Sequence, residues 1–328
     1  MKAHIASAHF RRAFALWLAA LALSPVAPLA AQEAAPAPLA WWVFDGLGAE
    51  IPDHSGNGNV AEILPPGGAE RMEDARTGVP ALWFGGGGPP AGSGCVESWG
   101  LAGKLDGPAF SISAWVCPEP PQAYAPIVTK VTDLGAWDDG FGVCLGPGGV
   151  PEAFAGGYGA AALSGAHAAR AGEWSHVCLT FDASAADGSN AVLYVNGLPR
   201  SSAESTGGAV ANGAPVRVGT LVGLSETRAW HGAVADVRVY DAALSGEDVL
   251  SVFAESPLAG AADTLGRGIP DLWAIFYGLD PLDPALADRV LNGDGLTVLR
   301  KYQLGMNPLN PVAAPLTPML RVHTPLEK

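Results

Sequence analysis

An aromatic side chain beside two carboxylates is the first group in this sequence that could do chemistry. Trp137, Asp138 and Asp139 lie between two apolar runs, and Tyr158 follows in a glycine-rich segment. A flat indole face suits the apolar side of a ring, and carboxylates accept hydrogen bonds from hydroxyl groups. We therefore regard these residues as a candidate sugar-binding site. The alternative is that Trp137 packs inward and caps a core.

An oxygen-rich loop with the sequence Asp-His-Ser-Gly-Asn-Gly-Asn runs from Asp53 to Asn59. Carboxylate, amide and carbonyl oxygens are the ligands that calcium prefers, so Asp53 and Asn57 are candidate metal ligands, with Asp236 as a third. The same residue types also build ordinary turns. Asp236 alternates with Arg238 along one strand and could simply pair with a neighbouring charge. Both interpretations stay open.

Four cysteines are the other reactive groups: Cys95, Cys117, Cys144 and Cys178. An even number in an exported chain predicts two disulfides, with three pairings open. The alternation of side chains places the last three cysteines on the strand face opposite the regular apolar row. The alternative is that the cysteines are small buried thiols that stay reduced.

Short strands joined by glycine- and proline-rich turns are the elements that must position these groups. We expect helix only at 245–253, where Ser245 can cap the first turn. Asn196-Gly197 predicts a hairpin turn. The apolar character of both faces of 191–195 indicates two stacked sheets. Strands are expected at 41–44, 81–84, 94–98, 109–117, 126–131, 140–145, 174–181, 191–196, 215–221 and 232–240.

Nine motifs in order carry a resemblance to a known family. They lie at 42–45, 53–59, 82–86, 110–116, 127–130, 137–142, 174–182, 193–197 and 232–240. In this order they resemble the laminin-G-like, concanavalin A-like jelly-roll domains of bacterial surface proteins. The resemblance implies two curved antiparallel sheets over 41–254 and a binding or adhesive role, often toward carbohydrate and sometimes with calcium. The fold expected is mainly β, an antiparallel two-sheet jelly-roll sandwich followed by a small helical pair.

The C-terminal part, 255–312, reads as a duplicated loop and helix, with helices at 269–278 and 296–305. It resembles dockerin-like or thrombospondin-type-3-like calcium repeats. Of the oxygen ligands expected, only Asp263 and Asp271 remain in the first loop and Asn292 and Asp294 in the second. Because calcium needs six to eight oxygens, its binding here is doubtful. We expect Arg267 and Lys301 to supply the positive charge instead, by pairing with Asp263, Asp271 or Asp294.

The first thirty-one residues predict export. A basic start, a short apolar run and small residues before position 32 are typical of a signal peptide, and the run is too short to span a bilayer. Residues 32–40 are expected to be a linker and 313–328 a tail, with no stable membrane anchor. The protein would then be secreted, periplasmic or on the outer cell surface. The formal net charge of −14 argues against nucleic acid as a partner.

Local motifs give no sign of catalysis. Glycanases on this type of fold place two carboxylates on one strand, as Glu-x-Asp-x-Glu or Glu-x-Asp-x-x-Glu, and neither spacing occurs. Carboxylates brought together from distant strands are the remaining route. The sequence therefore predicts a non-enzymatic module that binds a glycan or cell surface, with calcium as a candidate aid. The alternatives are an adhesive envelope protein that binds a surface protein and, less favoured, a glycoside hydrolase. The sequence indicates no oligomeric state.

Overall fold

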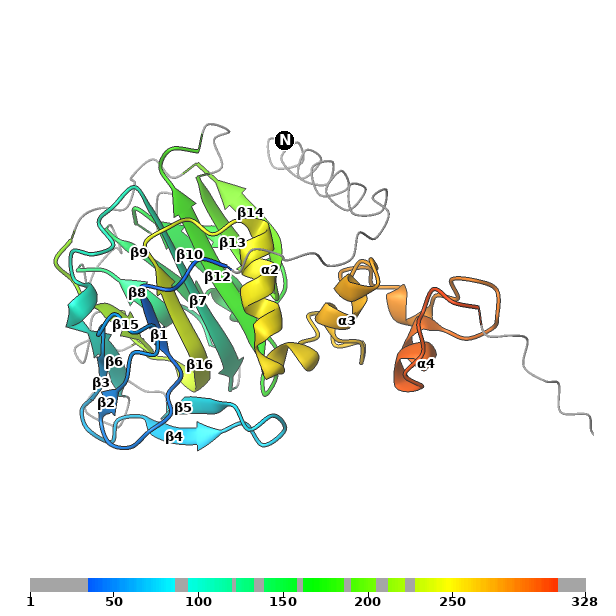
Figure 1. The fold of residues 1–328 in the computed structure, drawn as a ribbon, viewed down its shortest axis with the longest axis horizontal. Helices are drawn as coiled ribbons and strands as arrows, with labels where there is room; N and C mark the ends of the chain where they lie inside the picture. The colour runs from blue at the N-terminus through cyan, green and yellow to red at the C-terminus, as the bar shows by residue number, and fades with distance from the viewer. Residues whose placement is uncertain are drawn as a thin grey trace, which may run out of the picture. The chain divides into compact units, whose positions relative to one another are not determined.

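The computed structural model describes residues 35–85, 94–119, 122–132, 139–157, 162–185, 190–204, 212–221 and 228–311. The expected signal peptide, the first three residues of the linker (32–34) and the tail lie outside these residues. The described residues up to Thr264 form one compact unit, and those from Leu265 form a second. The larger unit is the expected two-sheet antiparallel sandwich, which confirms the fold class (Figure 1).

Sheet A has eight strands, in the order β14-β13-β12-β7-β16-β5-β4, with β1 paired to β16 as well. The long central strands β7 and β16 pair antiparallel, with a bulge between Ala235 and Arg238. The strands of sheet A are β1 (Ala40–Trp42), β4 (Glu70–Glu73), β5 (Pro80–Gly85), β7 (Ala109–Pro118), β12 (Ser175–Asp182), β13 (Ala191–Val195), β14 (Leu198–Ala203) and β16 (His231–Tyr240).

Sheet B also has eight strands, in the order β11-β10-β9-β8-β15-β6-β3-β2. Its short strands β2, β3 and β6 lie together at one end of the sandwich (Figure 1). The strands of sheet B are β2 (Glu50–Ile51), β3 (Ala61–Leu64), β6 (Cys95–Ser98), β8 (Ala125–Lys130), β9 (Phe141–Leu145), β10 (Pro151–Ala155), β11 (Leu163–Ser164) and β15 (Val216–Val218).

All ten strands that the sequence predicts are present, and the Asn196-Gly197 hairpin joins β13 to β14 as expected. Six further strands were not predicted: β2, β3, β4, β10, β11 and β14. They are short, and several carry charged or small residues with weak strand preference, so their pairing depends on the neighbouring strands.

The core lies between the two sheets and is built from the alternating apolar rows of their strands. Phe110 of β7 stacks on Phe141 of β9 in the opposite sheet, with ring centroids 3.9 Å apart, and on Phe181 of β12 at 5.3 Å. Because these rings face inward, the residues directly before and after each of them on its strand face outward. This parity decides which side chains can reach a ligand.

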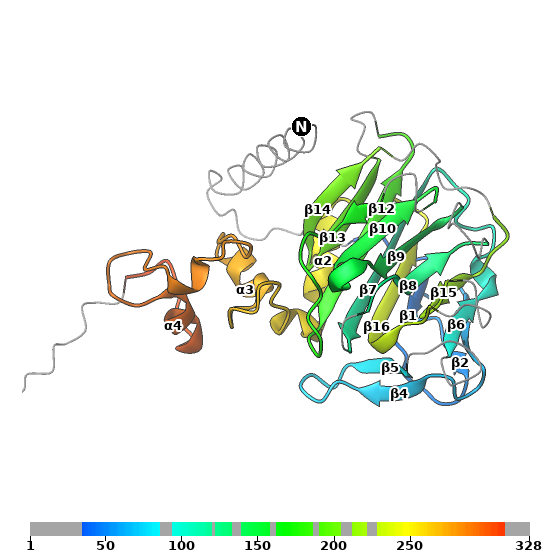
Figure 2. The same cartoon turned by 180° about the vertical axis from the view of Figure 1, so that it is seen from behind.

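Helix α2 (Gly246–Glu255) covers part of the outer face of sheet A, in front of the strands in Figure 1 and behind them in Figure 2. Ser245 caps its first turn together with Asp248, as the sequence predicts. Phe253 of the helix stacks on Trp115 of β7 at 5.4 Å. The helix therefore closes this face, whereas Glu50 and Glu62 on the outer face of sheet B are exposed.

The second unit contains the two expected C-terminal helices in shorter form, α3 (Asp271–Phe276) and α4 (Val298–Gln303). Its small core consists of Ile269, Ala274, Leu286 and Val298. Gly268 and Gly295 adopt φ values of 78° and 77°, which fits their predicted role in sharp turns before the helices. None of the helices in the described residues is long and apolar enough to cross a membrane.

Candidate functional site

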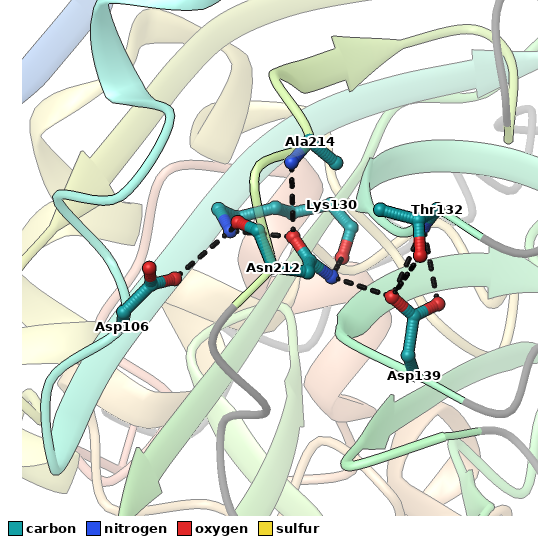
Figure 3. A network of polar contacts seen from close by, with 6 residues as sticks. All are labelled: Asp106, Lys130, Thr132, Asp139, Asn212 and Ala214. Carbon is teal, nitrogen blue, oxygen red and sulfur yellow. Dashed lines mark hydrogen bonds and ion pairs between the residues drawn. The ribbon is translucent and has the colours of Figure 1, made fainter.

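The predicted Trp-Asp-Asp site is described only in part, because Trp137, Asp138 and Tyr158 lie outside the described residues. Asp139 is described, and its carboxylate accepts hydrogen bonds from the backbone N–H and hydroxyl of Thr132 and from Asn212 Nδ2 at 2.8 Å (Figure 3). These bonds tie together the loops before β9 and β15. The role of Asp139 as a sugar ligand stays a prediction.

Lys130 anchors the same network from the end of β8 (Figure 3). Its side chain is buried, and Nζ donates to Asp106 Oδ1 at 3.0 Å and to both the backbone oxygen and Oδ1 of Asn212 at 2.6 Å. A buried charge is tolerated only with such partners. The network therefore connects the end of β8 to the loops that contain Asp106 and Asn212.

The carboxylate of Asp53 is occupied by its own loop. It accepts hydrogen bonds from the backbone N–H groups of Trp41, Ser55 and Asn59, at 2.8 to 2.9 Å. Burial acts to raise the pKa of Asp53, but these hydrogen bonds outweigh it and the pKa lies below its usual value. Asn57 donates from Nδ2 to the carbonyl oxygens of Pro38 and Leu39. The loop thus has the contacts of an ordered turn, and calcium binding by Asp53 and Asn57 stays a prediction.

Asp236 pairs with charge, as the alternative interpretation expects. Its Oδ1 accepts from Arg238 Nε at 2.9 Å and from Trp41 Nε1 at 2.7 Å. The guanidinium of Arg238 lies over the Trp41 ring, 4.6 Å from the centroid, and also pairs with Glu255 of α2 at 2.6 Å. Within the described residues no cluster of three or more acidic, histidine or cysteine side chains could hold a metal ion. Calcium binding by Asp236 stays a prediction.

The prediction of two disulfides was wrong, because all four cysteines are free thiols. Cys95 and Cys144 lie on sheet B, on strands β6 and β9, which β15 and β8 separate. Cys117 and Cys178 lie on neighbouring strands of sheet A, but the register pairs Cys178 with Ser113, so Cys117 is about 13 Å further along. Burial raises the pKa of Cys95 to about 12 and that of Cys117 to about 11, which keeps both protonated.

The four oxygen-bearing residues of the expected C-terminal calcium loops lie in different surroundings. Asp263 belongs to the sandwich unit, where it lines a small pocket with His167 and Trp174. Asp271 is buried at the start of α3. Asn292 and Asp294 both contact Lys301, so that Asp294 is the partner of Lys301 among the three aspartates that the sequence offers. Arg267 donates to the backbone oxygens of Pro281 and Asp283.

A row of carboxylates that was not predicted from the sequence crosses sheet B at the end formed by β2, β3 and β6. Glu50 on β2 is the register partner of Glu62 on β3, and Glu62 is the partner of Glu97 on β6. Their chain neighbours, among them Ile63 and Val96, belong to the core, so the three glutamates point outward. Side chains directly opposite on neighbouring strands have Cβ atoms about 5 Å apart, which brings these carboxylates together.

Glu97 is held in a fixed position within this row. Its Oε1 accepts from Arg217 Nε on β15 at 2.8 Å, and its Oε2 accepts from Trp99 Nε1 at 3.0 Å. Trp99 begins the short 3₁₀ helix Trp99–Leu101 and is 62% exposed. Glu62 is exposed beside it. The result is an exposed indole fixed next to two carboxylates from different strands.

This arrangement has the chemical groups that sugars require. The indole offers an apolar face, and the exposed carboxylate of Glu62 offers acceptors for hydroxyl groups. The side chain of Glu97 is only 11% exposed, and both of its oxygens already accept hydrogen bonds within the protein. Retaining glycoside hydrolysis uses two neighbouring carboxyl groups, and the register makes Glu62 and Glu97 direct neighbours at the level of their Cβ atoms. In the sequence, the alternation of Glu62 with Ala61 and Ile63 could have shown that it points outward. Only the sheet order shows that it lies beside Glu97.

Comparison with known proteins identifies the type of fold. Residues 96–250 match the family model described as the concanavalin A-like lectin/glucanases superfamily. The match covers a little under half of the chain and supports the jelly-roll domain. No curated protein matches the sequence.

Several solved structures share the fold. A mutant Trypanosoma rangeli sialidase displaying trans-sialidase activity aligns with a TM-score of 0.52 and 18% identity, over 72% of this chain and 36% of that one. The same sialidase in complex with 2,3-difluoro-KDN gives 0.51 and 17%, over 70% and 36%. Domain 4 of a GH43 extracellular arabinanase from Geobacillus stearothermophilus, in complex with arabinotriose, gives 0.49 and 18%, over 66% and 98%. This chain thus spans about a third of the length of the sialidase chains.

These findings correct the expected function. The sequence predicts a non-enzymatic binding module, with an adhesive protein as the alternative. Both predictions depend on the type of fold and on the missing Glu-x-Asp-x-Glu and Glu-x-Asp-x-x-Glu patterns. The structures that share the fold include sialidases, so the fold gives no sign of binding without catalysis. Carboxylates can also become neighbours from separate strands, as Glu62 and Glu97 do, and no spacing along one strand shows this.

Proposed function

We propose that this protein is carbohydrate-active and that a sugar chain lies on the outer face of sheet B, against Trp99, Glu62 and Glu97. The observation that carries the proposal is the exposed Trp99 ring, fixed by its hydrogen bond to Glu97 beside a second outward carboxylate. A preformed apolar platform with adjacent acceptors lowers the entropy cost of binding. The match to the concanavalin A-like lectin/glucanases superfamily supports this choice of ligand class.

The cross-strand pairing of Glu62 and Glu97 favours glycoside hydrolysis as the activity on this surface. Glu97 is fixed by Arg217 and keeps its carboxylate oriented, which suits a nucleophile or a charge-stabilising group. Glu62 is exposed and can exchange protons with solvent, which suits a general acid. The expected signal peptide supports a place of action outside the cytoplasm, where such substrates occur.

The experiment measures both binding and cleavage. The protein without residues 1–31 is incubated with sialylated, arabinose-containing and glucose-containing oligosaccharides, and released ends and equilibrium binding are measured separately. Trp99→Ala should weaken binding about tenfold, because the stacking surface is lost. Glu62→Gln and Glu97→Gln keep the shape and remove the charge, and should lower cleavage about a hundredfold or more.

Glu70→Gln is the matched control, since Glu70 is an exposed strand glutamate on sheet A. It should leave both readouts unchanged. Binding that Trp99→Ala weakens, without cleavage of any substrate, would keep the glycan surface and refute hydrolysis. A wild-type protein that neither binds nor cleaves any member of the panel would refute the proposed function as a whole.

A further inference from the structure

The ammonium group of Lys301 is enclosed by oxygen atoms in the second unit. Nζ lies 2.7 Å from Asp294 Oδ2 and 2.9 Å from Asn292 Oδ1. It also donates to the backbone oxygens of Asn310 at 3.1 Å and Pro308 at 3.2 Å. The side chains of Lys301 and Asp294 are 1% and 2% exposed, so the pair is sealed from solvent. Two side chains of the loop and two carbonyl groups beyond α4 thus converge on one cation.

The spacing of this loop is that of a helix-linked calcium loop. Such a loop takes ligands from its first, third, fifth, seventh, ninth and twelfth residues, the last a bidentate glutamate, and turns sharply at a glycine in sixth place. With Gly295 in sixth place, Asn292 and Asp294 fall on the third and fifth, and Lys301 falls on the twelfth. A positively charged side chain therefore occupies the position where the bidentate anionic ligand is expected.

Calcium does not fit these residues as they are arranged. Its six to eight oxygens would have to include those that already bind Lys301, and a second cation among them would face the ammonium directly. We infer that Lys301 takes the place of the metal ion, so that the second loop and helix of this unit fold around an internal cation and need no calcium.

The energetics of a buried pair make this inference testable. Removing one partner of a buried ion pair leaves the other charge uncompensated, which is strongly destabilising. Asp294 is such a partner, and its Oδ1 also accepts from the backbone N–H of Leu296 at 3.0 Å, just before α4. Loss of the ammonium should therefore loosen the loop and α4 together.

The test is hydrogen exchange of the full chain, read by mass spectrometry for peptides that cover residues 289–303. The wild-type protein should show the same exchange with a chelator as with millimolar calcium. Lys301→Met should exchange about a hundredfold faster in this segment. Lys301→Glu restores the expected anionic ligand, so calcium should slow its exchange about tenfold or more, whereas the chelator should not.

Arg300→Met is the matched control, because Arg300 is exposed on the same helix, next to Lys301. It should exchange like the wild-type protein. Peptides of the sandwich, such as those covering β7, report in the same run that the rest of the chain is folded. Faster wild-type exchange in the chelator would overturn the inference, and so would a Lys301→Met protein that is as protected as the wild type. None of these outcomes depends on the proposed function of sheet B.

Discussion

Two buried lysines in this protein are each held by specific oxygen atoms of neighbouring loops. Lys130 is bound by Asp106 and Asn212, and Lys301 by Asn292 and Asp294. Such arrangements offset the cost of removing a charge from water and fix the loops that supply the oxygens. His176 is different, because within the described residues neither of its ring nitrogens has a hydrogen-bond partner.

His176 should make the protein lose stability in acid. Burial, with a smaller contribution from the charge on Arg238, lowers the pKa of His176 from 6.5 to about 3. Between these two pH values the imidazole is protonated in the unfolded chain but neutral in the native state. The free energy of unfolding is therefore highest above pH 6.5 and decreases as the pH drops toward 3. Between about pH 7 and pH 4 the loss should approach 3 kcal/mol.

The check is urea unfolding of wild-type protein and His176→Phe across this pH range. Phenylalanine keeps the aromatic contacts with Trp115 and Phe253 but has no proton to bind. Its stability should fall less steeply with decreasing pH. Parallel curves for the two proteins would show that His176 does not contribute to the acid sensitivity.

At the scale of elements, the β13–β14 hairpin and helix α2 depend on each other. Asn196 and Gly197 both adopt positive φ, 51° and 75°, as a two-residue hairpin turn requires. A Cβ atom on Gly197 would lie 2.8 Å from Phe253 Cδ1 and 2.9 Å from Leu250 Cδ1, both in α2. Glycine is therefore required at this position for two reasons: the turn needs a positive φ, and α2 packs directly against the backbone.

Gly197→Ala should destabilise the sandwich by about 1–2 kcal/mol, because it adds backbone strain and a close contact with α2. Gly107→Ala is the control: Gly107 is not in the positive-φ region, and its Cβ would meet no atom within 4 Å. Denaturant unfolding measures both. Equal midpoints for the two variants would contradict the role assigned to the close approach of turn and helix.

At the scale of the whole molecule, the sandwich unit extends to Thr264, ten residues beyond the boundary at 254 that the sequence indicates. Leu258 and Ala262 in this extension are fully buried. Asn196 Nδ2 donates to Thr264 Oγ1 at 3.0 Å, and Glu255 pairs with Arg238 at 2.6 Å. The short segment after α2 thus completes the sandwich.

A chain truncated after Ala254 should be less stable than one truncated after Thr264. Burial of Leu258 alone contributes about 2 kcal/mol, and the shorter chain also loses the hydrogen bond from Asn196 to Thr264. Thermal unfolding of the two truncated proteins, both without residues 1–31, measures the difference. Identical midpoints would mean that residues 255–264 add nothing to the sandwich.

The sequence by itself determined the elements whose signals are local. Period-two alternation located ten strands, Asn196-Gly197 located a hairpin, and Ser245 located the start of α2. Each depends on interactions within a few residues, which a sequence displays directly. The pairing of Lys301 with Asp294 could be predicted for the same reason, because loop spacing places them together.

Only the tertiary structure decided which distant residues meet. Glu62 and Glu97 share one face because β3 and β6 are neighbours, although two strands of the other sheet, β4 and β5, lie between them in the chain. The two cysteines of each sheet cannot pair, because two strands separate Cys95 from Cys144 on sheet B and the register sets Cys117 far from Cys178 on sheet A. The carbonyl groups of Pro308 and Asn310 reach Lys301 only when the chain folds back. Sheet order and register depend on the packing of the whole core, and that information is spread over the entire chain.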